Sequence, residues 1–127
     1  MKQVGSVKAV DGVSFAVQPG ETLGLVGESG CGKSTLGKCL VRLYEPTAGK
    51  IDLEGRDITR MSQSQLRPLR KDIQMMFQDP AESLNSRFSV RQIVREPLNI
   101  QEVGSRKERD VMVEDLLEKV GLPRTAA

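Results

Sequence analysis

The chain has 127 residues, of which 38% are hydrophobic and 28% are charged, and its formal net charge is +2. These values are ordinary for one modest globular domain and argue against a fibrous or disordered chain. The small net charge gives no support for nucleic-acid binding, and no apolar run is long enough to span a membrane or to form a signal-peptide core. We therefore expect a protein of the cytoplasm.

The first predicted elements are β-strands. Residues 7–10 and 13–17 are rich in β-branched and apolar side chains, and Asp11-Gly12 between them is typical of a tight hairpin turn. A short uncharged run at residues 22–26 has the composition of a strand buried on both faces of a parallel sheet. The sequence therefore predicts an antiparallel hairpin followed by one buried strand.

The pattern Gly-x-x-x-x-Gly-Lys-Ser/Thr follows the predicted buried strand. Its glycines leave room for backbone amides to converge on phosphate oxygens, Lys33 can place a positive charge near the β and γ phosphates, and the Ser34 hydroxyl can bind Mg²⁺. The alternative is a glycine turn that binds no ligand, and the order strand, loop, helix argues against it. The predicted phosphate-binding residues are Gly27, Ser29, Gly30, Cys31, Gly32, Lys33, Ser34 and Thr35.

A helix is predicted directly after this loop, so the phosphates would lie at its N-terminus. Its apolar face consists of Leu36, Cys39, Leu40 and Leu43, at the spacing of one helical side. Cys31 and Cys39 would then lie about two turns apart, which is too far for a disulfide. We expect both cysteines to be reduced thiols without a redox role.

The middle of the chain alternates turns, short strands and a short helix. Residues 50–53 alternate polar and apolar side chains as a half-exposed strand does, and residues 55–57 are predicted to form a loop. Ser62 and Gln65 have the spacing of a capping box, which predicts a helix to about Arg70. Residues 73–77 are predicted to form another strand, which ends at Gln78.

The last third of the chain is predicted to be helical. Ser89 with Gln92, and Ser105 with Glu108, are two further capping-box pairs. Gly121, followed two residues later by a proline, is a typical stop signal for the last helix. The apolar face of that helix is predicted to be Val113, Leu116, Leu117 and Val120.

These motifs together resemble the ATP-binding subunit of an ABC transporter, and more narrowly the oligopeptide and dipeptide importer branch. The resemblance covers nearly the whole chain, with Ser86 where this branch commonly has proline. It implies an α/β P-loop NTPase fold that is incomplete: residues 1–78 would form the ATPase core with its initial hairpin, and residues 79–127 would begin the helical subdomain. The segments that carry the resemblance are residues 10–15 (VDGVSF), 24–35 (GLVGESGCGKST), 77–85 (FQDPAESLN) and 95–98 (REPL).

The resemblance also implies cofactors, partners and one further site residue. The cofactors would be ATP and Mg²⁺, and Gln78 would occupy the Q-loop, whose side chain in this family reaches the Mg²⁺ and the attacking water. Ser34 and Gln78 would therefore be the metal-binding residues. The implied partners are the permease subunits and a second ATP-binding subunit, which would hold the chain at the inner face of the cell membrane without a membrane span of its own.

Several residues that hydrolysis requires in this family are missing from the sequence. There is no histidine to serve as the switch residue, no Leu-Ser-Gly-Gly-Gln signature, and no apolar strand that ends in an aspartate and is followed by a glutamate. Residues 111–115 superficially resemble that strand, but their surroundings favour an amphipathic helix. No catalytic residue is therefore assigned, and we expect the N-terminal portion of an ATPase domain that binds Mg-ATP without efficient hydrolysis.

Two further expectations depend on what surrounds the loop. Residues 4–7 contain no aromatic side chain to stack on adenine, so selectivity for the base should be weak. The predicted buried strand and the first helix would lack the strands that usually cover them in this family, and the exposed apolar surface predicts marginal stability or self-association.

Two other functions remain open. One is a non-catalytic interaction module acting through residues 78–100. The other is an unrelated phosphate-loop enzyme such as a small-molecule kinase, for which no lid arginines or acceptor site are evident.

Overall fold

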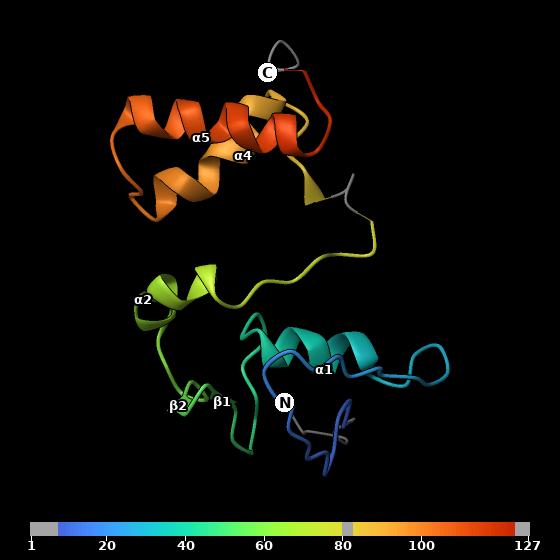
Figure 1. The fold of residues 1–127 in the computed structure, drawn as a ribbon. Helices are drawn as coiled ribbons and strands as arrows, with labels where there is room; N and C mark the ends of the chain where they lie inside the picture. Colours follow the sequence, from blue (N-terminus) through green and yellow to red (C-terminus); the bar gives the residue numbers. More distant parts are fainter. Residues whose placement is uncertain (1–7, 80–82, 124–127) are drawn as a thin grey trace, which may run out of the picture. The chain divides into compact units, whose positions relative to one another are not determined.

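The computed structural model describes residues 8–79 and 83–123 of the chain. It divides the chain into two compact units, Met1–Met75 and Met76–Ala127. The first unit contains helix α1 (Lys33–Leu40), strands β1 (Asp52–Leu53) and β2 (Arg56–Asp57), helix α2 (Gln63–Leu66) and the 3-10 helix η1 (Arg67–Lys71). The second contains helices α4 (Val90–Ile100) and α5 (Arg106–Lys119) (Figure 1).

A small apolar core lies in the second half of the first unit. Its buried members are Ile58, Leu66 and Leu69. The predicted capping box starts the helix that carries Leu66: the Ser62 hydroxyl accepts a hydrogen bond from the Gln65 amide at 3.3 Å, and the Gln65 side chain accepts one from the Ser62 amide at 2.8 Å. The partly buried residues packed around this core are Ile51, Leu53, Met61 and Ile73.

The strand predicted at residues 50–53 is confirmed at its second half. β1 pairs with β2 in an antiparallel register that places Asp52 opposite Asp57 and Leu53 opposite Arg56. The prediction of a loop at residues 55–57 is wrong for Arg56 and Asp57, because a two-residue turn at Glu54 and Gly55 returns the chain at once. Gly55 has a φ of +81°, which suits a tight hairpin.

The other predicted strands do not form. Residues 8–17, 22–26 and 73–77 contain no strand, and residues 8–26 are exposed throughout. An isolated pair of strands is marginal in water, and a parallel strand needs a partner strand that is distant in the chain, so apolar composition alone does not fix either structure. Among the described residues, none forms a sheet with residues 22–26. The predicted initial hairpin and buried strand are therefore wrong for this structure, although residue 7 lies outside the described range.

Two arginines fasten the end of α1 to the apolar core. The guanidinium of Arg42, a residue only 4% exposed, donates hydrogen bonds to the carbonyls of Ile58 and Met61, each at 3.0 Å. Arg70 in turn donates to the carbonyls of Val41 and Arg42. Positive charge at a helix C-terminus opposes the partial negative charge of its free carbonyls. Hydrogen bonds from two long side chains thus link the end of the helix to the core.

The chain leaves α1 through a left-handed residue. Arg42 has a φ of +54°, its amide donates to the Cys39 carbonyl at 2.9 Å, and the Leu43 amide donates to the Lys38 carbonyl at 2.8 Å. This is the hydrogen-bond pattern of a Schellman motif, which usually has glycine at the left-handed position. The helix predicted over Leu36, Cys39 and Leu40 is confirmed, whereas Leu43 lies beyond its end and is exposed.

In the second unit, α5 packs against α4 (Figure 1). Val113 and Leu117 of α5 are buried, as predicted, but Leu116 is 43% exposed and Val120 is 70% exposed. Two of the four residues predicted for the apolar face of this helix are therefore buried. None of the described helices is both long and apolar enough to cross a lipid bilayer.

An ion-pair cluster of partly buried side chains joins α4 to α5. Arg95 pairs with Asp110 at 2.9 Å, and Arg91 pairs with Glu114 at 3.1 Å and more distantly with Asp110. Arg109 binds the connection between the helices through the carbonyls of Val103 and Gly104. These ion pairs therefore fix how α4 and α5 are aligned along one side of their contact.

The starts and stops of both helices follow the sequence signals. Ser89 and Ser105 are the N-caps of α4 and α5, each within a complete capping box. At the end of α5, Gly121 has a φ of +77° and its amide donates to Glu118, while the Leu122 amide donates to Leu117. Residues 111–115 lie within α5, so the helical interpretation of that segment is confirmed.

The capping box of α5 leads to a pH-dependent prediction. Hydrogen bonds from the Ser105 amide and hydroxyl lower the pKa of Glu108 below its ordinary value. A lowered pKa in the folded state means that the stabilisation is present above the unfolded pKa and is lost as the pH falls through the folded pKa. We expect Ser105→Ala to raise the pKa of Glu108 in a carboxylate NMR titration. Ser89→Ala, which removes the matching cap of α4, should leave that pKa unchanged; an equal rise in both variants would contradict the local origin of the shift.

Candidate nucleotide-binding site

The predicted phosphate loop leads directly into α1. Gly32 is the N-cap of this helix, and Lys33 is its first residue. Gly30 and Gly32 have φ values of +81° and +94°, in the left-handed region that favours glycine. Residues 27–31 are exposed, so the loop is open to a ligand from solvent. The order of loop and helix is as predicted, but the preceding strand is absent from the described structure.

The ammonium group of Lys33 folds back into the loop. Its Nζ donates hydrogen bonds to the carbonyl of Gly27 at 2.6 Å and to that of Glu28 at 2.5 Å, and it lies 3.4 Å from the Cys31 Sγ. The loop therefore curls around a cation. A phosphate entering the loop would exchange two neutral carbonyl partners of this cation for an anionic partner, and charge-assisted hydrogen bonds are the stronger kind.

The two hydroxyl residues follow on the first turn of α1. Ser34 is exposed and Thr35 is partly buried, and neither side-chain hydroxyl bonds to another described residue. Both hydroxyls are therefore available within the described structure to contact Mg²⁺ or phosphate oxygens. The thiols of Cys31 and Cys39 are free, as predicted.

Gly32 also makes a contact that could not be predicted from the sequence. A Cβ at this position would stand 2.2 Å from the carbonyl oxygen of Ala9 and 3.6 Å from Cγ2 of Val10. Ala9 and Gly32 are far apart in sequence, and no motif links them, so only the tertiary structure brings them together. Gly32 is thus needed for two reasons, its left-handed backbone and the close approach of another segment.

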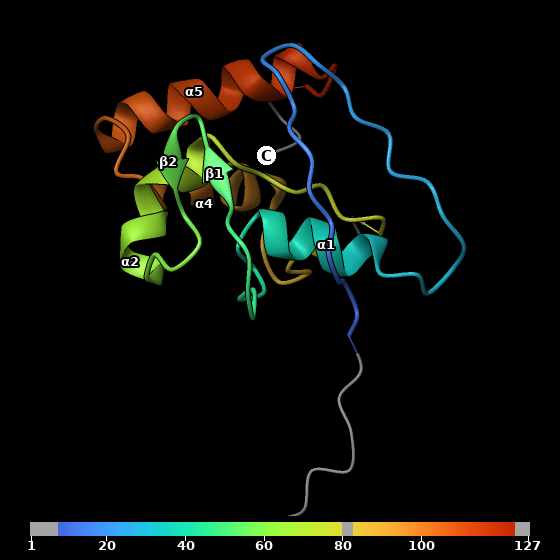
Figure 2. The ribbon, with the colours of Figure 1, turned by 90° about the horizontal axis from the view of Figure 1, so that it is seen from below.

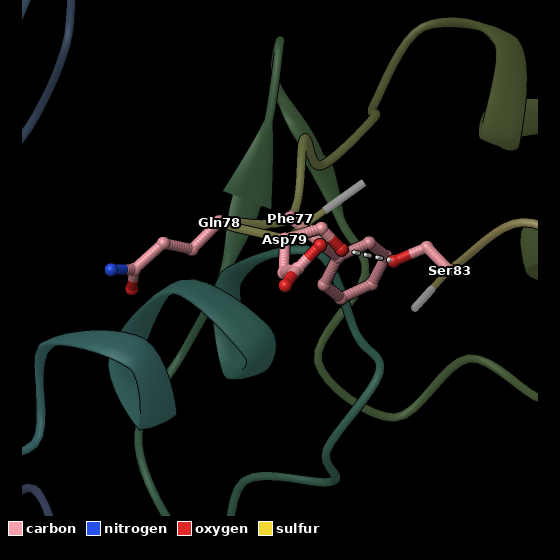
Figure 3. Close-up of a pocket in the computed structure, with 4 residues that line it drawn as sticks. All are labelled: Phe77, Gln78, Asp79 and Ser83. Atoms are coloured by element: carbon pink, nitrogen blue, oxygen red, sulfur yellow. Dashed lines mark hydrogen bonds between the residues drawn. The ribbon is translucent and has the colours of Figure 1, made fainter. Parts of the chain in front are cut away.

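Gln78 belongs to the second unit, where it lies at the edge of a shallow depression lined also by Phe77, Asp79 and Ser83. The Ser83 hydroxyl donates a hydrogen bond to the Asp79 carbonyl at 3.2 Å, whereas the Gln78 side chain extends away from the other three residues (Figure 3). Its assignment to the Mg²⁺ site stays a prediction.

The chemistry of the loop fits a magnesium nucleotide. Backbone amides, one ammonium group and two hydroxyls are available, and Mg²⁺ in such sites is held by few protein oxygens together with phosphate oxygens and water. A site built from protein ligands alone is a different matter: within residues 8–79 and 83–123, no group of three or more His, Cys, Asp or Glu side chains is arranged to hold a metal.

Comparison with known proteins agrees with the resemblance drawn from the motifs. The family model for ABC transporters matches residues 10–127. The chain is 55% identical over 122 residues to the oligopeptide transport ATP-binding protein AppF of Bacillus subtilis, with 95% of this chain and 37% of that protein covered. It is 49% identical over 125 residues to OppF, an oligopeptide transport ATP-binding protein of the same organism, with 97% and 41% covered.

A third relative is the di/tripeptide transport ATP-binding protein DppF of Pseudomonas aeruginosa, which is 46% identical over 116 residues, with 91% of this chain and 36% of that protein covered. The chain therefore spans between about a third and two fifths of the length of these relatives. The match includes the phosphate loop and both described helices of the second unit. On this evidence the chain belongs to the ABC transporter family.

Proposed function

We propose that this chain is the ATP-binding portion of an ABC transporter ATPase that drives the import of peptides or similar small solutes, and that by itself it binds Mg-ATP without efficient hydrolysis. The observation that carries the proposal is the phosphate loop: its ammonium group is already held inside the curled backbone at the start of α1. The class of solute is suggested by two relatives, which are named as oligopeptide and di/tripeptide transport ATP-binding proteins.

Five residues of the phosphate loop and the start of α1 have proposed roles in binding Mg-ATP. Backbone amides of Gly30 and Gly32 bind phosphate oxygens, Lys33 leaves its carbonyl partners to neutralise the β and γ phosphates, and Thr35 contacts the α phosphate. Ser34 would be a protein ligand of Mg²⁺, which would supply positive charge to the phosphates. Gln78 belongs to the same metal site in this proposal. Weak hydrolysis is proposed because this sequence holds no histidine and no signature motif.

The proposal extends to domain organisation and partners. Residues 1–78 would belong to the ATPase core and residues 79–127 to the start of the helical subdomain. That subdomain would bind permease subunits, and the core would face a second ATP-binding subunit. In this assembly the chain lies peripherally at the cytoplasmic face of the membrane.

Titration of the full chain with ATP tests the proposal directly. We expect saturable binding at one site, competition by ADP, and phosphate release no faster than the buffer background. Absence of saturable binding at millimolar ATP would refute nucleotide binding. Rapid turnover that Lys33→Ala abolishes would refute the proposed lack of efficient hydrolysis.

Removal of the Ser34 hydroxyl and removal of the Thr35 hydroxyl should change the ATP affinity differently when Mg²⁺ is present and when it is absent. Ser34→Ala is expected to weaken ATP binding roughly 10-fold in Mg²⁺ and to have little effect in EDTA, because the serine acts through the metal. Thr35→Ala, the matched control on the next residue, should weaken binding equally in both conditions. A Ser34→Ala loss that persists undiminished in EDTA would contradict the assignment of Ser34 to the metal.

A further inference from the structure

The contact between Ala9 and Gly32 connects the start of the described chain to the phosphate loop. Of the described glycines, only Gly32 has a backbone atom as the nearest obstacle to a Cβ, and that atom is the Ala9 carbonyl oxygen at 2.2 Å. The carbonyl therefore rests directly on the glycine. Gly32 is partly buried, whereas residues 24–31 before it are exposed, as expected of a residue covered by another segment.

A second contact with Gly32 and a local ion pair accompany the Ala9 contact. The Val10 side chain reaches the same spot on Gly32, with Cγ2 at 3.6 Å from the position of a Cβ. The Lys8 ammonium pairs with the Asp11 carboxylate at 2.9 Å, which closes the segment into a bend around Ala9. Both views of the fold show the start of the described chain passing alongside α1 (Figure 1, Figure 2).

The Ala9 carbonyl does not compete for the phosphate-binding amides. None of the backbone hydrogen bonds in the described part of the loop ends on this oxygen. The contact instead restricts the Gly32 backbone, the residue whose left-handed φ of +94° turns the loop into α1. Glycine has the largest backbone freedom of any residue, so a contact that restricts it lowers the entropy lost when a ligand binds.

We propose that residues 8–11 are a brace for the phosphate loop, in which Ala9 and Val10 are positioning residues that hold Gly32 in its phosphate-binding conformation. This inference rests on the proposed nucleotide binding and adds to it a determinant of affinity that touches no phosphate. The brace should act on any ligand with a polyphosphate chain, because it acts through the loop and not through a base or a sugar.

The test compares Val10→Gly with Val13→Gly in the full chain. Val10 supplies one of the three atoms nearest to the Cβ position of Gly32, whereas Val13, a 53% exposed valine just beyond residues 8–11, supplies none of them. Without nucleotide, Val10→Gly is expected to shift the Gly32 amide resonance, and an NOE from the Val10 methyls to the Gly32 Hα should be present in the unaltered chain. Affinities for inorganic tripolyphosphate and for Mg-ATP should both fall by about 3- to 10-fold.

The control variant and the methyl resonances of Ile58 should remain as in the unaltered chain, which separates the brace from a general loss of structure. The proposal is overturned if the Gly32 amide resonance and both affinities are the same in Val10→Gly as in Val13→Gly. It is also overturned if only the ATP affinity falls, because residues 8–11 would then contact the base or ribose. Absence of any binding by the unaltered chain would refute the proposed function, while the Gly32 amide shift and NOE would still support the contact.

Discussion

Replacing Arg42 by alanine is expected to lower the free energy of unfolding of the first unit by about 2–4 kcal/mol, because hydrogen bonds from a charged donor to two carbonyls are lost in a buried setting. The side chain donates to the carbonyls of Ile58 and Met61, and it is almost completely enclosed. The apolar core beside it has only three buried members. Urea denaturation followed by the methyl resonances of Ile58 and Leu69 measures this loss.

Arg60 provides a matched control for this prediction. It also donates to two backbone carbonyls, those of Pro46 at 3.2 Å and Thr47 at 3.0 Å, but its side chain is 62% exposed. Water can replace those bonds, so Arg60→Ala should cost less than about 1 kcal/mol. The loss of unfolding free energy in Arg42→Gly should lie between those of Arg42→Ala and Arg60→Ala, because glycine adopts the left-handed φ without strain. Equal losses in Arg42→Ala and Arg60→Ala would show that burial of the guanidinium is not the cause.

The second large effect concerns ligand affinity. Lys33→Ala is expected to weaken Mg-ATP binding by about 10- to 100-fold, the equivalent of about one charge-assisted hydrogen bond. The loop now holds the Lys33 ammonium by two carbonyls, so the charge is already positioned before a phosphate arrives. Isothermal titration of ATP into the full chain measures the change.

Lys38→Ala is the control, because it removes the same charge from the same helix. Lys38 lies in the last turn of α1 with its Nζ 5.2 Å from the centre of the Tyr44 ring, away from the loop residues that hold Lys33. Its loss should change affinity by no more than the general electrostatic effect of one exposed charge. A similar weakening in both variants would indicate nonspecific attraction of the anion to α1 and contradict a specific role for Lys33.

Local signals predicted the helices of this protein. The three capping boxes each depend on side chains three residues apart, so their geometry is complete within a single turn and needs no distant partner. The same is true of the stop at Gly121 and of the start of α1 after the phosphate loop. The phosphate loop, too, was evident because its pattern fixes both residue types and spacing.

Strands were poorly predicted because their stability depends on residues elsewhere. Residues 22–26 have a suitable composition, yet Leu23, Leu25 and Val26 are between 47% and 94% exposed, and no sheet in the described part of the chain includes them. β1 and β2 form, by contrast, because a tight turn supplies the partner strand immediately. Apolar composition indicates what a segment prefers, but a ladder of hydrogen bonds requires a neighbour.

The sequence by itself determined the local structures whose hydrogen bonds close within a few residues: α1 with its phosphate loop, the capped helices α2, α4 and α5, and membership of a nucleotide-binding family. Only the tertiary structure decided which long-range contacts hold these parts in place. It placed the Arg42 guanidinium on carbonyls near the core and the Ala9 carbonyl on Gly32. Such contacts join residues distant in the chain, and their energy depends on burial and close approach, which no short pattern of residues encodes.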